Sequence, residues 1–201
     1  KKLLGMAGIK NAEIVIGEGI TEKYYFRSLL DILTIRPRYE QVKPYNKKEL
    51  EAAINRYAKD GYTTIHCLID MDTKVRHPKT MEDYRKLKQK YDRKRVRKTN
   101  CEVRFYESFP SIEQFFYFYF ESSTAQQTND GLKSWLKHKC GYDTSDKYLR
   151  PHSLNGVFTK NGGCLKNAIT NAKKSVKLRE DNNFNCSYTE VGDLIEYLGV
   201  K

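Results

Sequence analysis

The stretch EIVIGEGITEKYYF, Glu13 to Phe26, joins an apolar run to a glycine turn and a helical pattern. The run over residues 13–17 predicts a short buried strand, because consecutive apolar residues are typical of the central strands of parallel sheets. After the turn, Thr21 can cap a helix, since a threonine oxygen accepts hydrogen bonds from the first free N–H groups of a helix. The expected apolar face of that helix holds Phe26, Leu29, Leu30 and Leu33.

Strand-like and helix-like segments alternate along the rest of the chain, which predicts an α/β fold with a mostly parallel sheet flanked by helices. Further strands are expected around Tyr39 to Tyr45, at Thr63 to Ile69 and at Cys101 to Tyr106. Helices are expected near Lys47 to Lys59, around Met81 to Tyr91, from about Ser111 to Phe120 and from Leu165 to about Leu178. From Asp130 onward the pattern is helix and loop, so we expect a helical C-terminal part. The polar residues 121–130 are the best candidate for a mobile loop.

Composition limits the class of protein. The chain has 201 residues, of which 39% are hydrophobic and 12% aromatic, enough to bury a sizeable core in one domain. Its longest apolar runs fall far short of the roughly 20 residues that cross a bilayer, and the N-terminus lacks the apolar segment of a signal peptide. We expect a cytoplasmic protein that has no membrane partner.

The cysteines suggest neither a disulfide framework nor a zinc finger, because they are odd in number and lack CxxC spacing. Scattered reduced thiols are the simplest interpretation, although a zinc site that uses His138 and Cys140 with a distant partner stays open. The five are Cys67, Cys101, Cys140, Cys164 and Cys186.

The net charge of +12 is concentrated in one segment. Residues 74–98 hold 12 Lys and Arg against three acids, a net charge of +9. Within this segment Met81, Tyr84, Leu87 and Tyr91 recur at helical spacing, which predicts a helix with a narrow apolar stripe and a basic face. A solvated surface helix is one interpretation. Because the opposing acids are nearly absent, we favour a surface that contacts nucleic-acid phosphates. Its predicted contact residues are Arg85, Lys86, Lys88, Lys90, Arg93, Lys94, Arg95, Arg97 and Lys98.

Carboxylates follow two of the expected strands. Glu18 stands between Gly17 and Gly19, where it contributes little to a core, and the strand TTIHCLI runs directly into Asp70 and Asp72. Residues i and i+2 of an extended chain point to the same side, so we expect both aspartates to face one spot. The carboxyl ends of parallel strands meet in one crevice, so Glu18 is expected there too. Three carboxylates at one place predict a site for Mg²⁺ or Mn²⁺.

These motifs resemble those of the RloB-like family, a branch of the Toprim-fold nucleases of prokaryotic defence loci, and the similarity runs nearly end to end. Residues 18–26, EGITEKYYF, are similar to the family's E-G-x-T-E-x-x-Y-F, and residues 70–72 resemble its D-x-D, with Met71 where Arg is common. Residues 108–113, SFPSIE, resemble S-N-P-x-F-E, with Phe109 in place of Asn. FTKNGG near Lys160 and the closing SYTEVGDLIEYL also follow the family's shape.

The resemblance implies a single RloB-like domain, with a Toprim-like core over residues 1–120 and a mainly helical extension over 121–201. It also implies metal-dependent phosphodiester cleavage, in which Asp70 and Asp72 hold the divalent ion that polarises the scissile phosphate. Glu18 either completes the metal shell or acts as a general base. Lys160, or a residue of the basic segment, offsets the charge that develops on the phosphate, although Lys160 can equally be plain surface.

The resemblance assigns three further residues. Glu113 either joins the metal shell or favours the helix dipole. Glu22 and Ser108 orient the metal ligands from behind, although Glu22 also suits the first turn of a helix.

The expected substrate is DNA, tRNA or another RNA, and the expected partner is an associated AAA- or ABC-type ATPase of an antiphage system. Two other classes remain open: a nucleic-acid-binding module whose acids bind metal only for structure, and a scaffold that docks on the ATPase through residues 115–120. Assembly into a homo-oligomer is also open.

Overall fold

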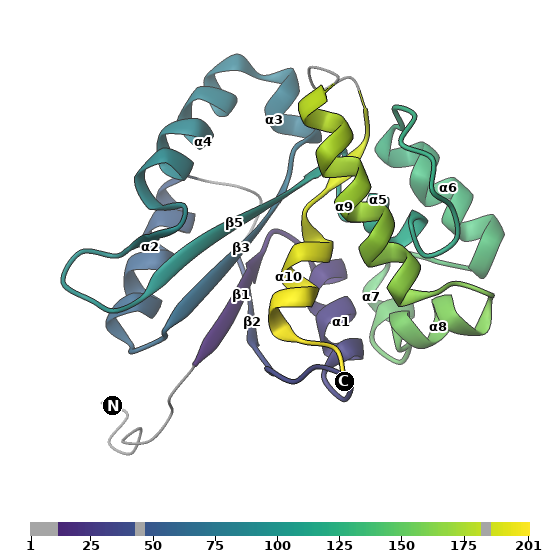
Figure 1. The fold of residues 1–201 in the computed structure, drawn as a ribbon, viewed down its shortest axis with the longest axis horizontal. Helices are drawn as coiled ribbons and strands as arrows, with labels where there is room; N and C mark the ends of the chain where they lie inside the picture. Colours follow the sequence, from purple (N-terminus) through teal and green to yellow (C-terminus); the bar gives the residue numbers. More distant parts are fainter. Residues whose placement is uncertain (1–11, 43–46, 182–185) are drawn as a thin grey trace.

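The computed structural model describes residues 12–42, 47–181 and 186–201 (Figure 1). Its centre is a six-stranded sheet in which β2, β1, β3 and β5 lie side by side in that order and run parallel. These strands are β1 (Glu13–Gly17), β2 (Arg38–Gln41), β3 (Thr64–Asp70) and β5 (Glu102–Phe109). Two short strands pair antiparallel with the outer edge of β5: β4 (Lys94–Arg95) at its beginning and β6 (Tyr188–Thr189) at its end.

Helices cover both faces of the sheet, which confirms the predicted α/β fold. One face is covered by α2 (Lys47–Lys59) and α4 (Pro78–Tyr91), and the short helix α3 (Asp72–Arg76) follows β3 directly. The opposite face carries α1 (Ile20–Leu29), α5 (Glu113–Tyr117), α6 (Asn129–Cys140), α7 (Asp146–Leu149), α8 (Leu154–Lys160), α9 (Leu165–Asp181) and α10 (Val191–Leu198).

Side-chain alternation along the strands divides the core in two. In β1, Val15 packs under α1 and its neighbours, whereas Ile14 and Ile16 pack under α2 and α4. Successive strand residues point to opposite faces, so a strand that is apolar at every position can bury both. The aromatic run after Pro110 fills the first of these cores, where Phe115, Phe116 and Phe118 are fully buried.

Two predicted helices differ from the structure. α1 begins at Ile20, with Gly19 and not Thr21 as its cap, because Glu22 Oε1 accepts the Gly19 N–H at 3.2 Å. α1 ends at Leu29, so Leu33 lies beyond it. The aromatic helix was predicted from Ser111 to Phe120, but α5 spans only Glu113–Tyr117, because residues 118–120 tighten into turns whose N–H groups bond mostly three residues back.

Strand boundaries differ as well. β5 extends to Phe109, three residues beyond the predicted end, and the two-residue strands β4 and β6 were not predicted. The strand expected around Tyr39 to Tyr45 is present as Arg38–Gln41, and Tyr45 lies outside the described residues. Among the helices in the described ranges, none combines the length and apolarity needed to cross a membrane.

Candidate functional site

Four carboxylates meet at the carboxyl ends of the parallel strands. Glu18 follows β1 and Asp70 ends β3, its parallel neighbour, so both lie at the same edge of the sheet. Glu22 comes from the first turn of α1 and Glu113 from the start of α5. We call Glu18, Glu22, Asp70 and Glu113 the acidic cluster.

Two members of the acidic cluster, Asp70 and Glu22, have a raised pKa. Burial, and then the charges of Glu22, Glu113 and Glu18, raises the pKa of Asp70 well above its ordinary value. Burial likewise raises the pKa of Glu22 to about 7, and the charges of Glu113 and Glu18 add to the increase. Ionising these carboxylates therefore costs free energy, and a cation placed among them offsets that cost.

Lys74 supplies one such cation. Its side chain comes from α3, is 1% exposed, and places Nζ 2.7 Å from Glu18 Oε1 and 2.7 Å from the Asp70 carbonyl oxygen. The sequence interpretation counted Lys74 only as part of the basic segment. Its position four residues after Asp70, one helical turn, is the signal that marks it as a partner of the strand end.

The glycines around Glu18 are explained by close neighbours. A side chain at Gly17 would overlap the hydroxyl of Tyr39, which donates a 2.8 Å hydrogen bond to the Gly19 carbonyl oxygen. A side chain at Gly19 would come 2.8 Å from Glu22 Oε2. The turn therefore admits only glycine at Gly17 unless the Tyr39 side chain moves.

Asp72 does not lie beside Asp70 in the way that the extended chain predicted. Met71 adopts a right-handed helical backbone (φ −98°, ψ −12°), so the strand ends at Asp70 and Asp72 is the first residue of α3. Its Oδ1 accepts the Thr73 N–H at 2.6 Å, and its Oδ2 accepts a 3.3 Å hydrogen bond from the Asn129 amide. The interpretation of 70–72 as one extended run is wrong, because a helix begins inside the motif.

Asn129 connects Asp72 to the acidic cluster. The Ser111 hydroxyl lies 2.9 Å from Asn129 Oδ1 and 2.7 Å from Glu113 Oε2, and the Tyr142 hydroxyl donates to Glu113 Oε1 at 3.0 Å. Glu113 is thus both the first residue of α5 and a member of the site. Asn129 and Tyr142 were not predicted, because they come from distant segments with no motif of their own.

Two other predicted residues lie apart from the acidic cluster. Ser108 pairs with Asp70 in the sheet register, but its hydroxyl lies 2.7 Å from Thr189 Oγ1 of β6. Lys160 is the exposed last residue of α8, and α8 lies on the opposite side of the molecule from α3 (Figure 1).

The donor set partly fits a hard divalent ion. Carboxylate oxygens are the ligands that Mg²⁺ and Mn²⁺ prefer. Within the described ranges, however, no three His, Cys, Asp or Glu side chains are grouped so that they could hold a metal ion, and this includes His138 and Cys140. One reason is Lys74, whose ammonium already pairs with Glu18 at the strand ends.

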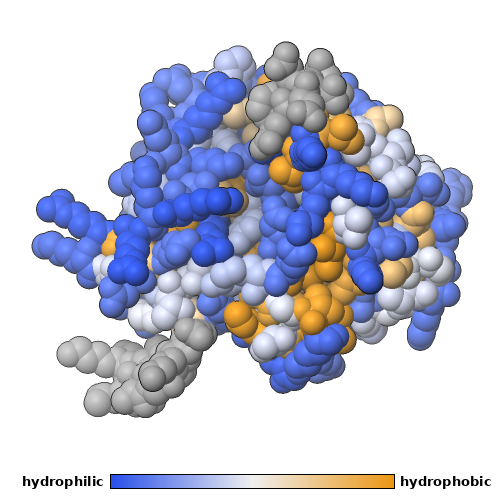
Figure 2. All heavy atoms as spheres, in the orientation of Figure 1, coloured by the Kyte–Doolittle hydropathy of each residue, from blue (hydrophilic) through white to orange (hydrophobic). Residues whose placement is uncertain are grey.

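The basic segment divides into two regions. On α4, Lys86 pairs with Glu82, Lys90 with Glu51, and Lys88 with Glu107. The exposed residues around β4 form the second region, at the amino end of β5 and thus at the opposite end of the sheet from the acidic cluster. Figure 2 shows hydrophilic residues over the α2 and α4 side and apolar residues nearer α10. The members of the second region, called the basic hairpin, are Arg93, Lys94, Arg95, Arg97 and Lys98.

A parallel sheet flanked by helices, with a partly buried acidic cluster at the carboxyl ends of its strands, defines a three-layer α/β protein with a polar site at the strand ends. The model of the family described as RloB-like protein matches residues 14–198, and the chain belongs to this family. No match was found among curated proteins or among solved structures.

Proposed function

We propose that this protein is a divalent-metal-dependent nuclease. The observation that carries the proposal is the acidic cluster: Glu22 and Glu113 are 3% and 4% exposed, and burial together with the neighbouring carboxylates raises the pKa of Glu22 and of Asp70, the last residue of β3. Buried like charges are costly unless a cation binds among them. The exposed basic residues of α4 and the basic hairpin supply the complementary attraction for phosphates.

Glu18, Asp70 and Asp72 would hold Mg²⁺ or Mn²⁺, which when bound polarises the scissile phosphate. The ion pair between Glu18 and Lys74 must break before Glu18 can bind the ion. Glu22 is a second candidate for the general base beside Glu18, because a carboxylate with a pKa of about 7 is half ionised at neutral pH and accepts a proton readily. Asn129 and Tyr142 fix the orientation of Asp72 and Glu113.

The biological setting is part of the same proposal. The nuclease acts in the cytoplasm as an effector of antiphage defence, on DNA or on tRNA or another RNA. An associated AAA- or ABC-type ATPase restrains it or delivers its target. The support for this setting is the family alone.

The test titrates Mg²⁺ and Mn²⁺ into the wild type and into Asp70→Asn, and follows thermal unfolding together with the cleavage of labelled DNA and tRNA. Asn keeps the acceptor for the Ile112 N–H, which bonds Asp70 Oδ1 at 3.0 Å, but carries no charge. Without metal we expect Asp70→Asn to be more stable than the wild type, because one repelling charge is gone. With metal at about a hundred times its Kd, only the wild type should gain about 2.7 kcal/mol. Cleavage should fall more than about a hundredfold in the variant.

The matched control is Asp31→Asn, which removes an exposed carboxylate from the turn after α1. It should respond to metal as the wild type does. The thermal readout needs no partner, so it tests the metal site even if the ATPase holds cleavage in check. A wild type that gains no stability from either ion would contradict the proposal.

The Lys74–Glu18 ion pair favours one alternative, a subunit that binds nucleic acid or docks on the ATPase without catalysis. In that case Lys74 is the permanent cation of the acidic cluster. Lys74→Met would then destabilise the fold strongly, as removal of one partner from a buried ion pair does, while metal ions would leave the wild type unchanged.

A further inference from the structure

A cavity of ≈ 550 Å³ lies between α4, α9 and the end of β5, and the acidic cluster does not use it. A second cavity of ≈ 390 Å³ adjoins it, since Val75, Phe109 and Gln126 line both. Asp72 lines the second cavity. Asp72 is therefore one cavity away from a ligand in the first, whose volume falls in the range of about 300–1,000 Å³ typical of ligand pockets.

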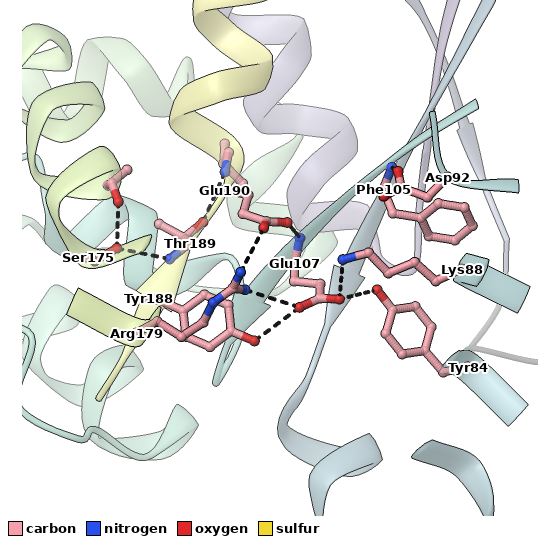
Figure 3. Close-up of polar contacts among 12 residues, drawn as sticks. Tyr84, Lys88, Asp92, Phe105, Glu107, Ser175, Arg179, Tyr188, Thr189 and Glu190 are labelled. Atoms are coloured by element: carbon pink, nitrogen blue, oxygen red, sulfur yellow. Dashed lines mark hydrogen bonds and ion pairs between the residues drawn. The ribbon is translucent and has the colours of Figure 1, made fainter. Parts of the chain in front are cut away.

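Glu107 organises the polar wall of the first cavity (Figure 3). The Lys88 ammonium and the Tyr84 hydroxyl each lie 2.6 Å from its Oε1. From α9 and β6, Arg179 Nη1 lies 3.3 Å and the Tyr188 hydroxyl 3.2 Å from its Oε2. Glu107 thus holds two cations at the cavity in fixed positions, before any ligand arrives.

The lining as a whole is positive. Arg85, Lys88 and Arg179 line the cavity together with one acid, Glu107, which gives the lining a net charge of +2. Behind the lining, Glu190 also pairs with Arg179, at 3.3 Å, so Arg85 is the lining cation for which neither glutamate is a recorded partner. Although burial raises the pKa of Glu107, the charges of Lys88 and Arg179 and the hydrogen bonds lower it below its ordinary value, so the glutamate is ionised. An anionic group is the ligand that such a wall attracts.

The other wall is aromatic. The rings of Phe109 and Tyr188 are stacked, with centroids 6.3 Å apart and an angle of 22° between their planes, and Met71 and Met81 complete the apolar lining. Tyr188 is buried and the Arg179 guanidinium lies over its ring at 4.4 Å, so Phe109, which lines both cavities, is the ring available to a ligand. A simple anion would need no such wall. A flat aromatic face beside fixed cations suits a ligand that has both a planar ring and a phosphate.

We propose that this cavity binds one unstacked nucleotide of the nucleic-acid substrate, with its base against Phe109 and its phosphate toward Arg85, Lys88 and Arg179. The identity of this ligand rests on the proposed function. The adjoining cavity would carry the next phosphate toward Asp72.

The test measures binding in EDTA, where no cleavage occurs, by titrating inorganic phosphate, adenosine, AMP and a single-stranded hexanucleotide. AMP should bind at least about tenfold more tightly than phosphate or adenosine, and the hexanucleotide should displace it. Phe109→Leu, which keeps an apolar side chain but removes the ring, should weaken AMP about tenfold and leave phosphate unchanged. Arg85→Gln should weaken AMP and phosphate alike, by about fivefold.

Lys174→Gln is the matched control, because it removes an exposed cation of α9 that does not line the cavity. It should bind AMP as the wild type does, and thermal unfolding should show that all three variants are folded. The proposal is overturned if AMP binds no better than phosphate, if Phe109→Leu binds AMP normally, or if the hexanucleotide fails to displace AMP, which would mark a site for free nucleotides.

The two proposals can fail separately. Tight binding of AMP and the hexanucleotide by a wild type that never responds to metal would leave the nucleotide site standing and remove the nuclease. Metal-dependent cleavage that is unchanged in Phe109→Leu and Arg85→Gln would leave the nuclease standing and remove the nucleotide site.

Discussion

Glu22 is the residue whose environment differs most from its place in a motif. A glutamate in the first turn of a helix is ordinarily exposed, but Glu22 is 3% exposed and shares its surroundings with Glu18 and Glu113. Its pKa is raised from 4.5 to about 7. Between these two values the folded state holds the proton more tightly than the unfolded state, so stability falls as the pH rises through this range.

Glu22→Gln should remove the loss of stability that the wild type shows as the pH rises. Glutamine keeps an oxygen for the Gly19 N–H but does not ionise, so the variant should exceed the wild type at pH 8 by on the order of 2–3 kcal/mol and match it near pH 4. Urea unfolding across this range measures the difference. Glu51→Gln serves as the opposite case, because Lys90 lowers the pKa of Glu51 and its loss should weaken the fold slightly at pH 8. If the stability of Glu22→Gln depends on pH as that of the wild type does, a group other than Glu22 causes the pH dependence.

At the scale of elements, the Asn129 side chain joins α6 to α3 through its hydrogen bond to Asp72. Asn129→Ala takes the hydrogen-bond donor from Asp72 and should cost about 1 kcal/mol. Because Asp72 then loses its fixed orientation, metal affinity should also fall, by about tenfold. Thermal unfolding with and without Mn²⁺ reports both quantities.

Thr128→Ala separates stability from orientation. Thr128 caps the same helix by accepting the Gly131 N–H at 3.1 Å, so its loss costs a similar amount but leaves the bond to Asp72 in place. Thr128→Ala should keep the metal response of the wild type. Equal metal affinities in the two variants would show that Asn129 does not position Asp72.

The long elements could be predicted from the sequence, because periodicity and burial agree over many residues. α2 has the predicted bounds, and β1 and β3 lie within one residue of theirs. The elements that were missed or wrongly predicted are short or depend on contacts between distant segments. β6 has two residues, too few for any period, and exists because it pairs with β5. The turn at Met71 leaves no mark in the spacing of Asp70 and Asp72.

The candidate site was predictable to a similar degree. Glu18 and Asp70 were placed correctly at neighbouring strand ends, since parallel topology fixes that meeting. The parts supplied by long-range packing, such as Lys74 against Glu18 and Asn129 against Asp72, were not. The assignment of these residues to metal binding and cleavage stays a prediction.

At the scale of the whole molecule, positive and negative regions lie at opposite ends of one sheet. Arg95 pairs with Glu102 at the start of β5, and Ser108 pairs with Asp70 at its end. At about 3.3 Å per strand residue, the basic hairpin and the acidic cluster are roughly 20 Å apart. A bound duplex rises 3.4 Å per base pair, so it must extend over about six base pairs to reach both.

The triple variant Lys94→Gln, Arg95→Gln, Arg97→Gln should therefore weaken binding in a length-dependent way. A 20-base-pair duplex should lose affinity, and the slope of log K against log salt should fall by about 2.7 if all three residues contact phosphates. A short duplex of four base pairs that occupies the acidic end should bind as before. Fluorescence anisotropy at several salt concentrations measures both slopes. The control removes the same charge from α9, at the exposed residues Lys166, Lys174 and Lys177. If the control lowers the affinity for the long duplex as much as the hairpin variant does, the attraction comes from net charge alone. The basic hairpin would then make no specific contact with the phosphates of a duplex bound at the acidic cluster.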